Sequence, residues 1–325
     1  MKILHRTLFA RSLFIVLIFA LGCACGLSYR SIGQKMKIKA HHKRYRIARN
    51  THPVLENKSF VILIMSYNNG PWIEKNLLSV LEQDYDNYRI IYINDASTDG
   101  SEKKIKQFIE LYDFKKRITL IENSQNKGAM YNMYHNVHAC RNEEIIVTVD
   151  GDDFLAHPHV LSTLNAYYAN PDVWLTYGNY VNYPMRIYQD KWVKSGCSPL
   201  DLTIVNQQGV RAHAFVTSHP RTFYAGLFKR IRKEDLLDEG NFVSTCCDVA
   251  CMLPMVELAG EHAYFVSDIL YCYNRENPIS DFRKDRMGQL KTEQKIKALP
   301  PYMPLSEHPK EEPTQTNLGS ACTSA

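Results

Sequence analysis

Several patterns that would assign a class at once are missing from this 325-residue sequence. Its nine cysteines are scattered and do not form a disulfide framework, and the CCDVAC stretch lacks the paired Cys-x-x-Cys spacing of a structural zinc site. We therefore expect buried free thiols. With 45% hydrophobic and 22% charged residues, the composition is that of a globular chain with a substantial core.

Acidic residues are absent between Arg30 and Arg49, a segment with eight lysines and arginines. Such a segment fits either nucleic-acid binding or a solvated stretch beside a membrane. We favour the second, with no nucleic-acid partner, because an apolar run at 13–27 precedes it. This run is short for a membrane span of about 20 residues and long for a signal-peptide core.

We accordingly expect a signal anchor, or as a second choice a cleaved signal peptide, at residues 1–29, and a basic linker at 30–57. The anchor would tether the protein to a membrane through a single pass. More basic residues follow the apolar run than precede it, which places the body on the cytoplasmic side. At the other end, residues 299–325 are rich in proline and polar residues and predict a disordered tail.

Between these ends, apolar runs alternate with segments of helical periodicity. Buried strands are predicted at 59–65, 88–93, 117–122 and 144–149, and helices at 71–83, 102–112 and 127–140. This alternation predicts an α/β fold with a mostly parallel central sheet flanked by helices. Further along, the pattern predicts a strand pair at 173–184, a helix at 221–231, a helix broken near Pro254 and a late strand at 263–278.

Three polar loops follow strands of this predicted sheet: SYNN from Ser66, NDASTD from Asn94 and DGDD from Asp150. Ligands of such sheets bind outside the carboxyl ends of the strands, so these loops are expected to converge. No glycine-rich, basic phosphate loop follows the first strand. This absence argues against a nucleotidyltransferase.

The DGDD loop places Asp150, Asp152 and Asp153 within four positions. Carboxylates that close repel one another unless they face open water or share a cation. Oxygen ligands of this kind suit magnesium or manganese, and the spacing is not that of an EF-hand. From the residues alone, a metal site and a solvated turn are both open.

The stretches FVILIMSYNN, LLSVLEQDYDNYRIIYINDASTDGS and NKGAMYNMYHNVHACRNEEIIVTVDGDDFL together resemble the nucleotide-sugar domain of family-2 glycosyltransferases, which have the GT-A fold. The resemblance covers residues 60–158. It implies that Asp95 hydrogen-bonds the nucleotide base, although Asn94 stands where many members have another aspartate. It also implies that Asp150 and Asp152, with Asp153 adjoining, hold a divalent cation on the donor diphosphate.

Other residues of the first half are expected near the donor. Ser66, Tyr67 and Asn68 form the first polar loop, and Asp150 is expected to reach the nucleotide through the cation. Lys127, in NKG at a helix start, would add a positive contact to the nucleotide, with a plain surface lysine as the alternative.

The second half also resembles the family, in STCCDVACMLPMVELAG and DILYCYNRENPIS. Where the family has an acidic pair at a helix start, only Asp248 is present, with Cys247 in the place of the other acid. The resemblance implies that Asp248 is the general base of an inverting reaction, and a helix cap is the alternative. His219 and Arg221 are further candidates for contacts with the diphosphate or the acceptor.

The sequence thus predicts a metal-dependent, inverting glycosyltransferase at residues 58–298, with a nucleotide-sugar half at 58–158 and an acceptor half at 159–298. Manganese or magnesium is the expected cofactor. The donor would be a nucleoside-diphosphate sugar, a UDP-sugar first, and the acceptor a glycan, lipid or protein hydroxyl. A non-catalytic carbohydrate- or partner-binding protein on the same fold is the alternative from another class.

Overall fold

The computed structural model describes residues 56–184, 187–188, 191–192, 197–201, 205, 208–279 and 286–311. The chain divides into residues 1–55 and residues 56–325, and the description below concerns the second unit. The predicted anchor at 1–29 lies outside the described residues, as does nearly all of the basic linker. Across the described ranges, none of the helices combines the length and the apolar character needed to cross a bilayer.

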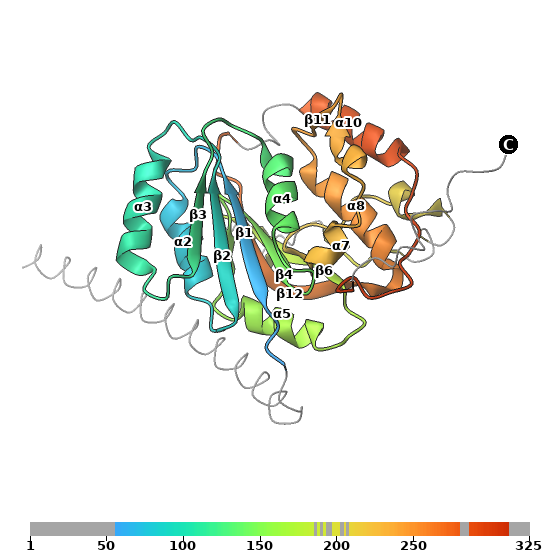
Figure 1. Ribbon diagram of the computed structural model, residues 1–325, viewed down its shortest axis with the longest axis horizontal. Helices are drawn as coiled ribbons and strands as arrows, with labels where there is room; N and C mark the ends of the chain where they lie inside the picture. Colours follow the sequence, from blue (N-terminus) through green and yellow to red (C-terminus); the bar gives the residue numbers. More distant parts are fainter. Residues whose placement is uncertain are drawn as a thin grey trace, which may run out of the picture. The chain divides into compact units, whose positions relative to one another are not determined.

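A mixed sheet of eight strands forms the centre of this unit, in the order β3-β2-β1-β4-β9-β6-β12-β5 (Figure 1). The first four strands in this order are parallel. They are β1 (Phe60–Ser66), β2 (Tyr88–Asn94), β3 (Ile118–Glu122) and β4 (Ile145–Asp150). This half agrees with the four strands predicted from the sequence, and the mixed α/β fold is confirmed.

The other half of the sheet contains antiparallel pairs. Strand β9 runs antiparallel to both of its neighbours, β4 and β6, while β6 and β12 are parallel and β5 is antiparallel to β12. Their bounds are β5 (Phe154–Leu155), β6 (Leu175–Tyr183), β9 (Arg221–Tyr224) and β12 (Ala263–Asn274). Two short hairpins lie outside the sheet: β7 (Ile187–Tyr188) with β8 (Lys191–Trp192), and β10 (Leu237–Asp238) with β11 (Asn241–Phe242).

The sheet must curl strongly, because β4 and β5 are separated by three residues in the chain but by three strands in the sheet. Residues 151–153, the last three of the DGDD loop, make this connection. The loop therefore joins the parallel half of the sheet to its last strand. This position brings β12 close to the carboxylates of the loop.

Helices cover the two faces of the sheet. On one side α2 (Ile73–Leu81) packs with α3 (Ser101–Tyr112), and on the other α4 (Ala129–His138) packs with α7 (Ala225–Phe228), which contacts α8 (Cys247–Ala259). Figure 1 shows the two groups on opposite sides of β1 and β2. Among the described residues, the remaining helices are α5 (Val160–Tyr168), α10 (Arg286–Ala298) and the 3₁₀ turns η1 (Val210–Ala212), η2 (Lys233–Leu236) and η3 (Gly260–His262).

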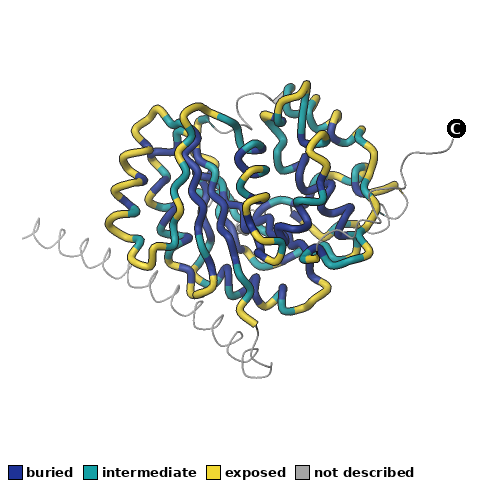
Figure 2. The backbone as a smooth tube through the Cα atoms, in the orientation of Figure 1, coloured by how far each residue is buried: buried dark blue, intermediate teal, exposed yellow. Residues whose placement is uncertain are grey.

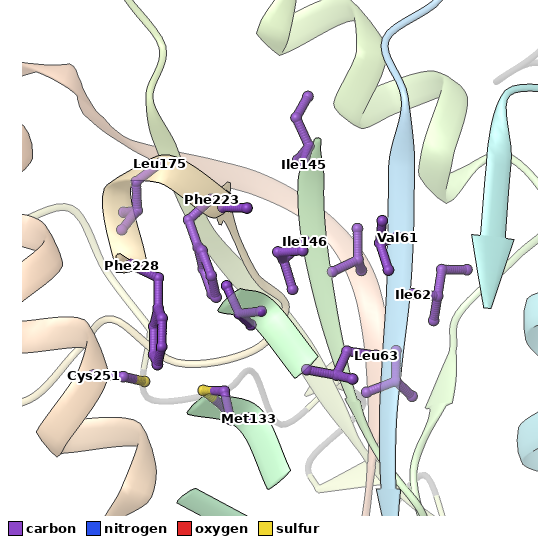
Figure 3. Close-up of a cluster of buried hydrophobic side chains, with 14 of the residues drawn as sticks. Val61, Ile62, Leu63, Met133, Ile145, Ile146, Leu175, Phe223, Phe228 and Cys251 are labelled. Carbon is purple, nitrogen blue, oxygen red and sulfur yellow. The ribbon is translucent and has the colours of Figure 1, made fainter. Parts of the chain in front are cut away.

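Burial explains why the parallel strands have continuous apolar sequences. Strands β1 and β4 are covered on both faces, so nearly all of their residues are buried (Figure 2). Figure 3 shows the core beside them, where Met133 of α4 and Cys251 of α8 lie close to Phe228 of α7. Cys251 is a buried free thiol, as predicted.

Three segments of the second half differ from their sequence predictions. The helix expected to be broken near Pro254 is continuous, because α8 runs from Cys247 to Ala259 with Pro254 inside it. Residues 221–224, expected to open a helix, form β9 because they pair with both β4 and β6, and only 225–228 are helical. The predicted strand pair at 173–184 is one strand, β6, with Gly178 inside it. A Cβ on Gly178 would lie 3.1 Å from the backbone oxygen of Val266, so the glycine permits close approach of β12 and does not mark a turn.

Residues 299–311 pack against the body. The amide of Leu305 donates to the oxygen of Leu258 at 2.9 Å, and the amide of Tyr302 donates to Glu257 Oε2 at 3.1 Å. The backbone carbonyl of Leu258, near the end of α8, thereby gains a partner. For residues 299–311 the structure differs from the expectation of a disordered tail, and 312–325 lie outside the described residues.

Candidate functional site

The carboxyl ends of β1, β2 and β4 meet at one edge of the sheet. In the parallel register Ser66 pairs with Asn94, and Met65 pairs with Asp150, so the three polar loops start side by side. Backbone hydrogen bonds continue past the strands, because the amide of Asp95 donates to the oxygen of Ser66 at 2.9 Å. The predicted convergence of the loops is confirmed.

The first two loops are bound to each other. The Asn68 amide donates to Ser97 Oγ at 2.9 Å, and the Asn68 side-chain oxygen accepts from the Thr98 amide at 2.7 Å. Asn68 has a φ of 54°, a left-handed conformation that asparagine tolerates better than most residues. Beside it the Tyr67 side chain is exposed, so its ring is accessible to a ligand.

Asp95 is buried and holds the next loop in place. Its carboxylate accepts hydrogen bonds from Asn123 Nδ2 at 2.7 Å and from the amides of Lys127 and Gly128, both at 2.9 Å. These contacts use three of the about four acceptor positions of a carboxylate. Asp95 thus fixes the start of α4, and its contact with a nucleotide base stays a prediction. The Lys127 side chain extends over the ring of Tyr131, 5.5 Å from its centroid.

Asn76 of α2 stabilises the DGDD loop through hydrogen bonds to its backbone. Asn76 is fully buried, and its Nδ2 donates to the backbone oxygens of Asp150 and Asp153 at 3.0 and 2.7 Å. The sequence analysis missed this residue. A signal was present, since Asn76 lies on the buried face of an amphipathic helix with Ile73 and Leu77, and a buried amide needs hydrogen-bond partners.

Gly151 allows the tight packing of this loop. A Cβ at position 151 would lie 2.6 Å from both Cβ and Oγ of Ser66 and 2.7 Å from Asn69 Nδ2. Such distances are far inside van der Waals contact, so a side chain here would push the DGDD loop away from the first loop.

Replacing Gly151 by alanine is therefore expected to lower the free energy of unfolding by about 1–3 kcal/mol, the usual cost of overpacking. Chemical denaturation of the two proteins measures this. The matched control is the double variant Gly151→Ala/Ser66→Gly, which removes the opposing Cβ and should recover part of the loss. Equal stability of Gly151→Ala and the wild type would contradict the packing described here.

Asp153 is the most deeply buried of the three carboxylates. Its Oδ2 accepts from the hydroxyl of Tyr271 at 2.8 Å, and its Oδ1 accepts from the Asn274 amide at 2.6 Å. Burial raises the pKa of Asp153 well above its usual value, and the neighbouring charges of Asp152 and Asp150 raise it further. A cation among these groups would oppose that effect, because a positive charge favours the ionised carboxylate.

Asp152 is oriented by a different partner. Its Oδ2 accepts from Asn277 Nδ2 at 2.7 Å, and the same amide group lies 3.2 Å from the side-chain oxygen of Asn69. Asn277 follows β12, so the end of this strand links the first loop to the DGDD loop. The sequence analysis did not single out Tyr271, Asn274 or Asn277, because no local pattern connects them with the loop.

Within the part of the chain that the structure describes, one group of three side chains could hold a metal ion. Ligand atoms of Asp150, Asp153 and His219 all lie within 4.8 Å of one another. His219 is buried and stacks on Tyr271, with ring centroids 4.5 Å apart. Burial lowers the pKa of His219 well below its usual value, and the charge of Arg221 adds to this, so the imidazole is neutral, the form that binds metals.

The residues present therefore fit a divalent cation. Two carboxylates and a neutral imidazole converge. The sequence analysis had assigned the metal to Asp150, Asp152 and Asp153, and had named His219 only as a contact of the diphosphate or the acceptor. The structure brings Asp150 and Asp153 together with His219, while the metal role of Asp152 stays a prediction. An imidazole nitrogen favours manganese over magnesium, which prefers oxygen ligands.

Arg221 connects the DGDD loop with α8. Its Nη2 lies 3.6 Å from Asp150 Oδ2, and its Nη1 lies 3.6 Å from Asp248 Oδ2. The guanidinium is buried, and burial alone would lower its pKa, but the carboxylates of Asp150 and Asp248 raise it above the usual value. One fixed positive charge thus lies between the candidate metal ligand and the candidate base.

Asp248 lies in the first turn of α8, and its side chain is 34% exposed. Its Oδ1 accepts from the Val249 amide at 2.9 Å, whereas the residue that caps the helix is Cys246. The carboxylate therefore faces Arg221 with Oδ2 and retains access to solvent. This geometry suits a group that must reach an incoming hydroxyl.

The sequence profile of the family described as Glycosyl transferase family 2 matches residues 61–239, more than half of the chain. Glycosyltransferase GlyG of Streptococcus pneumoniae serotype 4 is 28% identical over 222 residues, which are 66% of this chain and 70% of that protein. A Haemophilus influenzae protein described as an uncharacterized glycosyltransferase is 28% identical over 128 residues, 39% of this chain and 38% of that protein.

Among solved structures, S. aureus TarS 1–349 in complex with UDP is similar, with a TM-score of 0.49 and 16% identity, over 68% of this chain and 61% of that one. The chain thus spans less than two thirds of the Haemophilus relative and of the TarS chain, and slightly more than two thirds of GlyG.

Proposed function

The chain belongs to glycosyl transferase family 2, and on this premise we propose that it moves a sugar from a nucleoside-diphosphate sugar to an acceptor hydroxyl with the help of a divalent cation. The observation that carries the proposal is the pair of carboxylates that flanks Arg221. Asp150 belongs to the possible metal group, and Asp248 faces the same guanidinium from α8.

Different residues would bind the cation and the nucleotide. Asp150, Asp153 and His219 would hold the cation, which would supply positive charge to the diphosphate leaving group. Asp152, next to them in the loop, is a further ligand candidate. The loops with Ser66, Tyr67, Asn68, Asp95 and Lys127 would bind the nucleotide, and a UDP-sugar is the first donor to test.

Asp248 would act as the general base. It would take the proton of the acceptor hydroxyl while the hydroxyl oxygen attacks the anomeric carbon. The bond between that carbon and the phosphate oxygen breaks, and the nucleoside diphosphate departs with the electron pair. Direct displacement of this kind inverts the configuration at the anomeric carbon. The guanidinium of Arg221, 3.6 Å from Asp248 Oδ2, would orient this carboxylate.

A screen of nucleotide sugars with and without manganese tests the function. We expect manganese-dependent release of nucleoside diphosphate from one donor, UDP-sugars first, and an increase when a glycan, lipid or peptide acceptor is added. The control variant is Glu110→Gln, which removes an exposed carboxylate on α3. Manganese-dependent UDP binding without turnover of any donor would instead favour a non-catalytic binding protein.

A further inference from the structure

An exposed apolar patch lies at the end of α3, away from the carboxylate site. Leu111, Tyr112 and Phe114 are 61%, 48% and 85% exposed, and the exposed Lys115 and Lys116 follow directly. We call these five residues the α3 tip. Single exposed apolar side chains are common on soluble proteins, but three within four positions form a patch.

The helical pattern accounts for Tyr112, whose ring centroid lies 4.7 Å from that of Phe108, but not for Leu111 and Phe114. The buried face of α3 consists of Ser101, Ile105 and Phe108, and most of the remaining surface of the helix is exposed (Figure 2). Leu111 lies off that face, and Phe114 lies beyond the end of the helix. The acid between them, Asp113, is turned inward, because its carboxylate accepts from the amides of Arg117 and Ile118, both at 2.8 Å.

The α3 tip lies at the amino-terminal edge of the sheet. Strand β3 begins at Ile118, immediately after the tip, and Arg117 donates to the backbone oxygen of Tyr88, the first residue of β2, at 2.8 Å. Tyr88 pairs with Phe60, the first residue of β1. Residue 56, where the described chain begins, is therefore close to this same edge.

The chain before residue 56 is the part for which the sequence analysis expects contact with a membrane. It carries the basic segment from Arg30 to Arg49 without an acid, and before it the apolar run at 13–27. Apolar side chains combined with lysines are the usual means by which a protein surface contacts anionic lipid. The α3 tip likewise combines apolar side chains with lysines. The carboxylate of the exposed Asp86 lies 3.4 Å from Lys115 and reduces the net positive charge of the tip.

We propose that the α3 tip is a membrane-contacting surface, with Phe114 and Leu111 at the lipid interface and Lys115 and Lys116 on anionic headgroups. The carboxylate site lies at the opposite edge, about 20 Å away along strands of seven residues. In this orientation the donor and acceptor enter from the aqueous side. The acceptor is then a group that projects from the membrane or is free in solution.

Tryptophan fluorescence of the full chain tests this orientation. Phe114→Trp and, as matched control, Met303→Trp, whose native side chain is 82% exposed, are mixed with vesicles of phosphatidylcholine and phosphatidylglycerol that carry brominated acyl chains. Both variants share the native tryptophans, so the difference between them reports the new position. We expect extra quenching for Phe114→Trp and none for Met303→Trp.

Equal quenching of the two variants, or none at position 114, would overturn the proposal. A blue shift of Phe114→Trp emission without vesicles would also overturn it, because another copy of the chain would then cover the patch. Adding Lys115→Glu and Lys116→Glu should weaken the quenching, and an unchanged signal would refute the role of the lysines. No outcome depends on sugar transfer, so the test is independent of the proposed activity.

Discussion

Replacement of Asp150 by asparagine is expected to remove manganese-dependent binding of UDP and to lower the transfer rate about 100- to 1000-fold, the usual cost of losing one electrostatic contact to a leaving group. The reason is geometric. Asp150 is the residue shared by the possible metal group and the contact with Arg221. Asparagine keeps the size of the side chain but not its charge.

Calorimetric titration of UDP at several manganese concentrations measures this effect. The same titration on Asp152→Ala decides whether Asp152 is also a ligand, as the family resemblance implies. Glu110→Gln again serves as the control, with binding unchanged. If Asp150→Asn bound UDP with the manganese dependence of the wild type, the cation would have to lie elsewhere.

Replacement of Asp248 by asparagine is expected to lower sugar transfer about 100- to 10,000-fold, the range that general acid–base catalysis contributes. Donor binding should stay within a few-fold of the wild type. Asparagine retains a side-chain oxygen that can accept from the Val249 amide, so the start of α8 should be preserved. The amide cannot take the proton of an acceptor hydroxyl.

Two measurements separate this role from a structural one. The thermal unfolding temperature should match that of the wild type, and the affinity for the donor should be retained while the transfer rate falls. An Asp248→Asn enzyme with full transfer activity would show that another group deprotonates the acceptor. In that case the contact between Asp248 and Arg221 would be structural only.

The sequence predicted the parallel half of the sheet well, and the reason is local. Runs such as FVILIM are covered on both faces, so burial is visible as an unbroken apolar string. The antiparallel half was harder to predict. Residues 221–231 place Phe223, Leu227 and Phe228 at helical spacing, but pairing with β4 and β6 determined the conformation of the first four.

The candidate site could likewise be predicted from the sequence only where it is formed by the parallel half of the sheet. The three polar loops were recognisable because each follows its own strand. His219 and Arg221 could be named only as weak candidates, since their closeness to Asp150 depends on β9 inserting next to β4, about 70 positions along the chain. Tyr271 and Asn277 were missed for the same reason, because only the curled sheet brings the end of β12 to the DGDD loop.

The curl of the sheet also limits how this protein can be divided or recombined. Asp153 belongs to the first half of the domain, yet both partners of its carboxylate, Tyr271 and Asn274, come from a strand more than a hundred residues later. A fragment that stops at residue 158 would leave this acid without them. Chimaeras that replace residues 159–298 with a foreign segment must therefore retain β12, or the DGDD loop of the first half will lose the contacts that shape it.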